Sequence, residues 1–189
     1  GVSRATGDIA VAHDLAHEAI EILDRGATDS WARATPRIIQ AHTLNLLGKY
    51  EQALESLDDF EEISHDTPDL EARLTGAALR AKIYSITGRA NPEPYLAQAS
   101  RIWDFHWEHY GRDLSVMAKV EHARVNGNDQ KILDVTARPE VQKIITTQRG
   151  FLTYRAHALL NLKKFEQTEA LLAELDRQRQ VTWYEQWGT

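Results

Sequence analysis

Histidines and a carboxylate spaced one helical turn apart are the side chains of this sequence whose spacing could support chemistry. His13, His17 and Glu21 lie at i, i+4 and i+8, so a helix would place them along one face, and all three are residue types that bind Zn²⁺. The spacing differs from the His-Glu-x-x-His motif of zinc enzymes, and no second cluster of ligands is evident in the sequence. We therefore predict a solvated helix face, and the same holds for His106 and His109.

No other arrangement in the sequence predicts catalysis. The chain contains no cysteine, which removes thiol nucleophiles, thiolate metal ligands and disulfides. Residues 58–62 include four carboxylates, which fit a solvated helix face and the attraction of a basic partner equally well. An acid–base pair would also need a pocket and separated pKa values. Because glycine-rich phosphate loops and serine elbow motifs are not found either, we predict no catalytic residue, no metal, no cofactor and no enzymatic activity.

Length, composition and charge limit the class of protein. The 189 residues fit one domain or one run of small repeats, and 42% hydrophobic with 26% charged residues suit a soluble, folded chain. The longest apolar runs, such as residues 9–12 and 170–173, have four residues, whereas a membrane-spanning helix needs about 18. The net charge of −6 disfavours direct contact with nucleic acid. Since cysteine is lacking, we expect a reducing, cytoplasmic location without membrane contact.

Turns recur along the chain at nearly constant spacing. Successive turns are 41, 40, 39 and 36 residues apart and lie at Gly7, Gly48, Gly88, Gly127 and Lys163-Lys164. Residues 41–52 and 156–167 are identical at seven of twelve positions. Between the turns, apolar residues recur at i, i+3 and i+4 without sustained alternation, which indicates amphipathic helices. Each repeat is therefore predicted to be a helical hairpin.

Capping residues define the ends of the predicted helices. Thr35-Pro36, Thr67-Pro68 and Asn91-Pro92 predict helix starts, because proline is tolerated at the first helical position. Glycine accepts the left-handed conformation that ends a helix, which predicts helix ends at Gly26, Gly48, Gly88, Gly111 and Gly127. The predicted helices span residues 8–25, 30–47, 50–63, 69–87, 93–110, 112–126, 129–136, 140–148, 150–162 and 165–179.

Residues 47–57, Leu-Gly-Lys-Tyr-Glu-Gln-Ala-Leu-Glu-Ser-Leu, resemble the turn and second helix of a tetratricopeptide repeat (TPR). Ala41 and Leu44 match the small and bulky positions of the family's first helix, and Ala53 and Leu57 match those of its second helix. The later units match less well, and the period near 40 exceeds the 34 residues usual for the family. The resemblance implies an all-α fold, a right-handed α-solenoid of antiparallel helical hairpins, formed as a single domain over residues 1–189.

A TPR-like fold implies a concave groove, lined by the first helix of each hairpin, that binds a peptide or protein partner. The family's groove positions carry hydrogen-bonding side chains over an aliphatic floor in this chain. The Lys and Asn pattern with which some members bind a C-terminal carboxylate is lacking. The predicted groove residues are Ile38, Ile39, His42 and Asn45 in the best-matching unit, Ala78, Leu79, Lys82 and Ser85 in the next, and Met117, Glu121, Arg124, Tyr154, His157 and Asn161 in the weaker units.

The resemblance also implies a setting for the domain. Long, irregular repeats of this kind occur in the sensor or oligomerisation parts of large bacterial regulators, so we expect the sensor or interaction arm of a regulatory protein. The chain begins at Gly1 without an initiator methionine, and residues 182–187 lie where a further repeat would begin. We therefore expect a piece of a longer protein.

Two other functions stay open beside peptide binding. The first is self-association, for example as a homodimer through the aromatic segment at residues 102–110 or the tail at residues 183–187. Within the aromatic segment, Trp103, Trp107 and Tyr110 share one helical stripe, which favours packing between repeats. The second is a sensor that binds a small effector in an apolar pocket between repeats.

Overall fold

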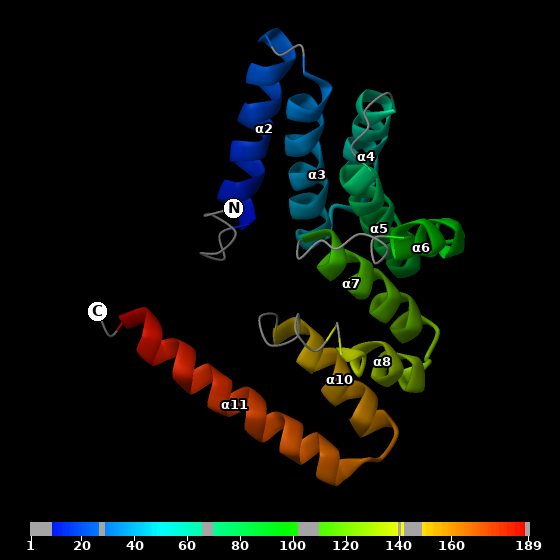
Figure 1. The fold of residues 1–189 in the computed structure, drawn as a ribbon, viewed down its shortest axis with the longest axis vertical. Helices are drawn as coiled ribbons and strands as arrows, with labels where there is room; N and C mark the ends of the chain where they lie inside the picture. The colour runs from blue at the N-terminus through cyan, green and yellow to red at the C-terminus, as the bar shows by residue number, and fades with distance from the viewer. Residues whose placement is uncertain are drawn as a thin grey trace. The chain divides into compact units, whose positions relative to one another are not determined.

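The computed structural model describes residues 9–26, 29–65, 70–101, 110–139, 141 and 149–187. Within these ranges the chain forms helices joined by short turns, with no strand, so the predicted all-α fold class is confirmed. Figure 1 shows the helices along the chain: α2 (Ile9–Gly26), α3 (Ser30–Leu46), α4 (Tyr50–Ser64), α5 (Leu70–Thr87), α6 (Glu93–Ser100), α7 (Tyr110–Val125), α8 (Asp129–Thr136), α10 (Arg149–Asn161) and α11 (Phe165–Trp187).

The predicted helix boundaries agree with the observed ones to within two residues over most of the chain. Two ends differ by more: the helix predicted to reach Tyr110 ends at Ser100, and α11 continues to Trp187. The helix predicted for residues 140–148 lies outside the described residues except for Val141. The turn at Gly7 and the Thr67-Pro68 pair also lie outside them.

The prediction that a helix starts at Thr35-Pro36 is wrong. Helix α3 begins five residues earlier, and Pro36 lies inside it. A proline in a helix interior leaves the carbonyl four residues earlier without its donor. Ala34 and Ile38, on either side of the proline, are buried in a cluster with Phe60 of α4. We infer that this burial offsets the lost hydrogen bond, which local propensity alone could not reveal.

Two further boundary predictions have opposite outcomes. Asn91-Pro92 begins a helix as predicted, because Asn91 Oδ1 accepts a hydrogen bond from the backbone N–H of Glu93 at 3.1 Å. Gly111 was predicted to end a helix, and this is wrong, since it is the second residue of α7. Glycine disfavours a helix by only about 1 kcal/mol, which the burial of side chains such as Leu114 outweighs.

The turns between paired helices occur where the repeat predicts them. Gly48, Gly88 and Gly127 have left-handed backbones, with φ of 73°, 66° and 64°. At Gly48 and Gly127, two consecutive N–H groups donate to carbonyls three and five residues earlier at 2.8 to 3.1 Å, which is the Schellman arrangement. Lys163 repeats this arrangement with both distances at 2.9 Å and a φ of 58°. The fifth turn therefore places a lysine in a conformation that favours glycine.

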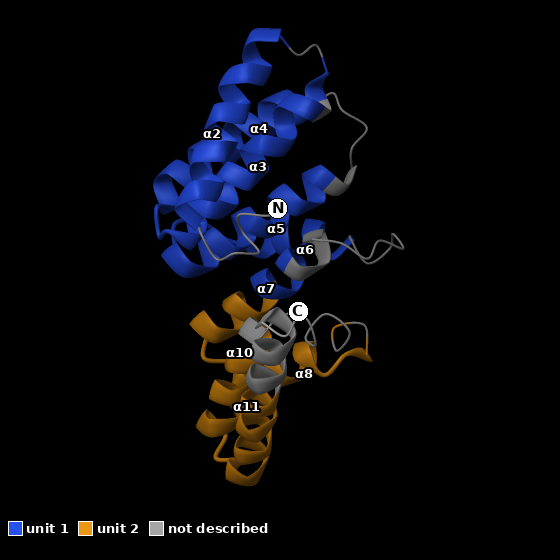
Figure 2. Cartoon of the chain, turned by 90° about the vertical axis from the view of Figure 1, so that its left-hand side faces the viewer, with its two compact units in different colours: residues 1–118 blue, residues 119–189 orange. Residues whose placement is uncertain are grey.

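The helices pack as two compact units, residues 1–118 and 119–189 (Figure 2). In the first unit, α3, α4 and α5 share a core to which the TPR-like positions contribute. Ala41, Ala53 and Leu57 are each 0% exposed, and Leu44 is 4% exposed. Small residues let the paired helices approach closely, while each buried leucine contributes about 1.5 to 3 kcal/mol. The packing roles implied by the resemblance are thus confirmed at these four positions.

Gly76 lets α5 approach α4. A Cβ atom at this position would lie 2.8 Å from Cε1 of Phe60, well inside the roughly 3.5 to 4.0 Å of ordinary carbon–carbon contact. The Phe60 side chain is 0% exposed, so its ring cannot move into solvent. A side chain larger than hydrogen at residue 76 would therefore force the two helices apart.

A buried arginine joins α4 to α5. Arg80, 4% exposed, donates to Asp58 at 2.7 Å and to Glu61 at 3.0 Å, and its guanidinium carbon lies 5.8 Å from the ring centre of Tyr95. Burial lowers the pKa of Arg80, but hydrogen bonds to Tyr84 and Asp58 and the charges of Glu61 and Asp58 outweigh it, so the pKa lies above its usual value. Two of the four carboxylates at residues 58–62 therefore hold neighbouring helices together.

The second unit has its own core, in which α10 packs against both α8 and α11. Ile132 of α8 and Phe151 and Leu159 of α10 are 1%, 0% and 4% exposed. Arg155 of α10 adds a polar link, since its Nη1 lies 3.5 Å from the carbonyl oxygen of Thr136. This packing fixes the orientation of α10, which also carries the residues described next.

Candidate functional site

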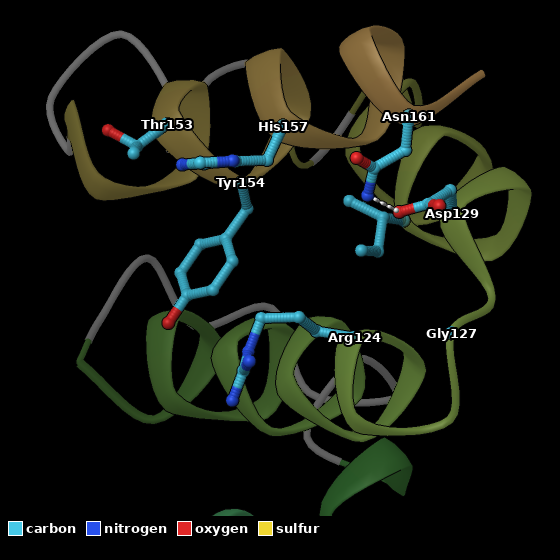
Figure 3. A pocket seen from close by; sticks show the side chains of 8 residues that line it. Arg124, Gly127, Asp129, Thr153, Tyr154, His157 and Asn161 are labelled. Atoms are coloured by element: carbon cyan, nitrogen blue, oxygen red, sulfur yellow. Dashed lines mark hydrogen bonds between the residues drawn. The ribbon is translucent and has the colours of Figure 1, made fainter.

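A cavity of about 540 Å³ lies in the second unit. Its walls come from the end of α7, the turn at Gly127, the start of α8 and one side of α10. Figure 3 shows the side chain of Tyr154 reaching from α10 toward α7, which carries Arg124. The lining residues are Arg124, Gly127, Asp129, Ile132, Thr153, Tyr154, His157 and Asn161.

Helix α10 supplies one wall as a continuous stripe. Tyr154, His157 and Asn161 are separated by three and four residues, so they lie on the same side of the helix. Tyr154 is half-buried, whereas His157 and Asn161 are exposed. Ile132 of α8 also borders the cavity but is only 1% exposed, so the Tyr154 ring supplies the apolar surface there. The cavity thus combines an aromatic ring with polar side chains, as ligand sites commonly do.

Arg124 and Glu121 form a fixed ion pair on α7. Arg124 Nε donates to Glu121 Oε2 at 3.1 Å, and a terminal nitrogen donates to Oε1 at 2.8 Å. The Glu121 side chain is 6% exposed and that of Arg124 is 50% exposed. A two-point ion pair orients a guanidinium more strictly than a single hydrogen bond does. Arg124 therefore presents a fixed planar group to the cavity, with its charge balanced by the buried carboxylate behind it.

Asp129 and Asn161 are linked across the opposite side of the cavity. Asn161 Nδ2 donates to Asp129 Oδ1 at 3.2 Å, as the dashed line in Figure 3 marks. Asp129 is the first residue of α8, whose start is capped by Asn128, since its Oδ1 accepts from the backbone N–H of Lys131 at 3.0 Å. A capped helix start holds the backbone of Asp129 in place. Its carboxylate accordingly has a defined position at the cavity wall.

The structure brings four of the predicted groove residues together around one cavity. Arg124, Tyr154, His157 and Asn161 all line it, and predicted Glu121 lies buried behind Arg124. Gly127, Asp129 and Ile132 were not predicted as groove residues, because the family's groove positions lie on the first helix of each hairpin. Thr153 lies on such a helix, directly before the predicted Tyr154, but at a position that was not predicted. The Asn-Asp pair directly after the turn glycine was the available signal, since it marks a helix start that must lie beside the next hairpin.

In the first unit, most predicted groove residues are buried. Ile38 and Leu79 are core side chains at 6% and 0% exposure, so they offer no surface in this structure. Asn45 is 5% exposed, and its side-chain amide has no hydrogen-bond partner among the described residues. The others in this unit are Ala78, His42, Lys82 and Ser85, which are buried, Met117, which is partly buried, and Ile39, which is 37% exposed. A groove along these residues stays a prediction.

The remaining chemical candidates make only local contacts. His17 Nε2 lies 3.6 Å from Glu21 Oε1, and His13 lies 3.3 Å from its neighbour Asp14. Among the described residues, no group of three or more His, Cys, Asp or Glu side chains could hold a metal ion. The same part of the chain contains no helix long and apolar enough to cross a membrane. The predicted aromatic segment lies largely outside the described residues, and the side chains of the tail are not described.

Comparison with known proteins identifies the fold. The chain is similar to a Podosopora anserina protein described as a kinesin light chain with nearly identical TPR-like repeats, at a TM-score of 0.55 and 18% sequence identity. The match covers 96% of this chain and 91% of that chain. No protein-family model and no curated protein sequence match the chain. At this identity the likeness concerns the fold alone, and the chain has a TPR-like repeat fold, as the resemblance implied.

Proposed function

We propose that this chain is a protein-interaction module that binds an extended peptide segment of a protein partner at the cavity between α7, α8 and α10. TPR-like folds generally mediate protein–protein interaction and typically act as scaffolds without catalysis. The observation that carries the proposal is the cavity of about 540 Å³, around which side chains from three helices converge.

The composition of the cavity suits a peptide. An extended main chain exposes alternating N–H donors and carbonyl acceptors, and the rim offers both kinds of partner through Asn161 and His157. The Tyr154 ring supplies apolar contact for one side chain of the partner. The site would therefore recognise a ligand by contact, without a chemical step.

The proposal can be tested by selecting peptides and then perturbing the rim. Peptides selected from a random phage-displayed library would be measured by fluorescence anisotropy against the wild-type chain, Asn161→Ala and His157→Ala. Both side chains are exposed, so the variants should keep the fold, and we expect Kd to rise about tenfold, which is the loss of about 1.4 kcal/mol.

A matched control separates the cavity from the rest of the surface. Glu166 is an exposed residue of α11 that does not line the cavity, so Glu166→Ala should leave Kd unchanged. The proposal would be rejected if no peptide is selected, or if selected peptides bind wild type, Asn161→Ala and His157→Ala equally.

A place in a larger bacterial regulatory protein, a sensor role and a cytoplasmic location stay predictions, as does homodimer formation. They rest on the sequence resemblance and composition, and a shared fold at 18% identity carries no information about attached modules. Light scattering of the chain over a range of concentrations tests the homodimer directly.

A further inference from the structure

We infer that the cavity of the second unit takes the cationic side chain of a lysine or arginine in the bound peptide, with the Asp129 carboxylate as its main acceptor. This inference rests on the proposed function and specifies its ligand. The observations that carry it are the charges, the aromatic ring and the hydrogen bonds around the cavity.

The balance of charge at the cavity favours a cation. Arg124 and Glu121 neutralise each other through two hydrogen bonds of 3.1 and 2.8 Å. Asp129 pairs with no cation within the described ranges, and its side chain accepts a hydrogen bond from the Asn161 amide at 3.2 Å. A carboxylate has about four acceptor positions. Asp129 therefore keeps both its charge and the capacity to accept further hydrogen bonds.

Asn161 adds a second acceptor beside that carboxylate. Because an ionised carboxylate only accepts hydrogen bonds, the NH₂ group of Asn161 must face Asp129. Its carbonyl oxygen then points elsewhere on an exposed side chain that lines the same cavity. A guanidinium or ammonium group, which only donates, can use both acceptors together.

The apolar part of the cavity fits the stem of such a side chain. Lysine and arginine carry methylene groups that pack on apolar surface while the charged end stays at a polar rim. The half-buried Tyr154 ring forms that surface here. A cation near a tyrosine face gains a further attraction. Stem and charge can thus be satisfied at the same time.

An acidic side chain is disfavoured by the same geometry. Its natural partner, Arg124, already uses two donors on Glu121, and an incoming carboxylate would lie near the charge of Asp129, which lines the same cavity. Like charges at such a site raise the cost of binding. In addition, the net charge of −6 on the whole chain attracts basic partners over longer distances.

The test uses small probes that isolate the side chain. N-acetyl-arginine methylamide and N-acetyl-lysine methylamide would be titrated into the ¹⁵N-labelled full chain to about 10 mM, where a millimolar Kd approaches saturation. N-acetyl-norleucine methylamide and N-acetyl-glutamate methylamide serve as neutral and acidic references. We expect the cationic probes to shift the Asn161 side-chain amide and the Ile132 backbone amide, with Kd about fivefold below that of norleucine.

Three variants assign the preference to Asp129. Asp129→Asn should abolish the fivefold difference between arginine and norleucine, whereas Asp129→Glu should keep most of it. Glu166→Gln removes the same charge from an exposed position of α11 outside the cavity and should change nothing. Raising the salt concentration should weaken the binding of the cationic probes only. This measurement uses the wild-type chain, so it remains informative even if Asp129→Asn loosens the first turn of α8.

Each result decides a different question. The inference is overturned if norleucine or glutamate binds as tightly as arginine, if no probe shifts the cavity residues, or if Asp129→Asn leaves the arginine preference intact. In those cases the proposed function still stands when library-selected peptides bind Asn161→Ala about tenfold more weakly than wild type. If those peptides also ignore Asn161, the proposed function fails as well.

Discussion

The turn between α10 and α11 allows a direct test of how the repeat specifies its backbone. Lys163 has a φ of 58° and the same hydrogen bonds as the turns at Gly48 and Gly127. A residue with a Cβ loses about 1 to 2 kcal/mol in this conformation, whereas glycine loses about 0.5 to 1 kcal/mol through the greater freedom of its unfolded chain. The exposed Lys163 side chain has no hydrogen bond or ion pair among the described contacts. We therefore expect Lys163→Gly to stabilise the second unit by about 0.5 to 1 kcal/mol.

Urea unfolding followed by circular dichroism measures this change, and thermal unfolding should show a Tm higher by about 2 °C. The reverse change, Gly48→Lys, should destabilise the first unit by a similar amount, because Gly48 has a φ of 73° and no atom within 4 Å of an added Cβ, so only the backbone is strained. A Lys163→Gly variant of unchanged or lower stability, together with a harmless Gly48→Lys, would refute the argument from backbone conformation.

Two further predictions concern the first unit. Gly76→Ala should destabilise it by about 1 kcal/mol, because overpacking against Phe60 at 2.8 Å outweighs the helix propensity of alanine. In a Phe60→Leu background, the same substitution should leave the free energy of unfolding unchanged. A Gly76→Ala substitution that stabilises the parent chain would contradict this. For pH, a hydrogen bond from Arg37 is the main cause that holds the pKa of Asp24 below its usual 3.8, with burial opposing it. This stabilisation is present above the unfolded pKa and is lost as pH falls through the lower folded pKa. In Asp24→Asn, the free energy of unfolding should therefore fall less steeply below about pH 4 than in the wild-type chain. Glu18→Gln, on the exposed face of the same helix, should show the wild-type pH dependence.

The turns were predictable because their signals are local. A left-handed residue after a helix nearly demands glycine, and Gly48, Gly88 and Gly127 ended their helices as predicted. The turn at Lys163 lacks that signal, and only its match to the segment around Gly48 revealed it. Pro36 shows the opposite case, since its local preference for a helix start is overruled by burial of its neighbours against Phe60.

The site was only partly predictable, because some of its residues lie together on one helix, whereas others reach it only through packing between helices. Tyr154, His157 and Asn161 lie at groove positions carried over from the TPR family, so the resemblance was enough to select them. Asp129 reaches the cavity only because α8 begins beside α10, 32 residues away from Asn161 in sequence. Likewise, the acidic residues Asp58 and Glu61 looked free until α5 placed Arg80 between them. Contacts of this kind depend on tertiary packing, which a single sequence does not state.

Equivalent repeat positions are used differently in successive repeats. Six residues before the turn lie His42, Lys82 and Glu121, which are 6%, 6% and 5% exposed, whereas His157 at the same position is exposed. The arginines also differ in burial and in the location of their partners. Arg37 and Arg80 are buried and bind carboxylates on the preceding helix. The Arg124 side chain is 50% exposed, and its partner Glu121 lies on the same helix.

Polar groups committed to holding helices together cannot also bind a ligand without a large energetic cost. In the first unit, Arg37 and Arg80 are committed in this way, since each is ion-paired to the helix before it. In the second unit, His157 and Asn161 stay on the surface around a cavity. The same repeat pattern thus supports stability in one unit and leaves a candidate binding surface in the other, which is why the proposed function is assigned to α7, α8 and α10.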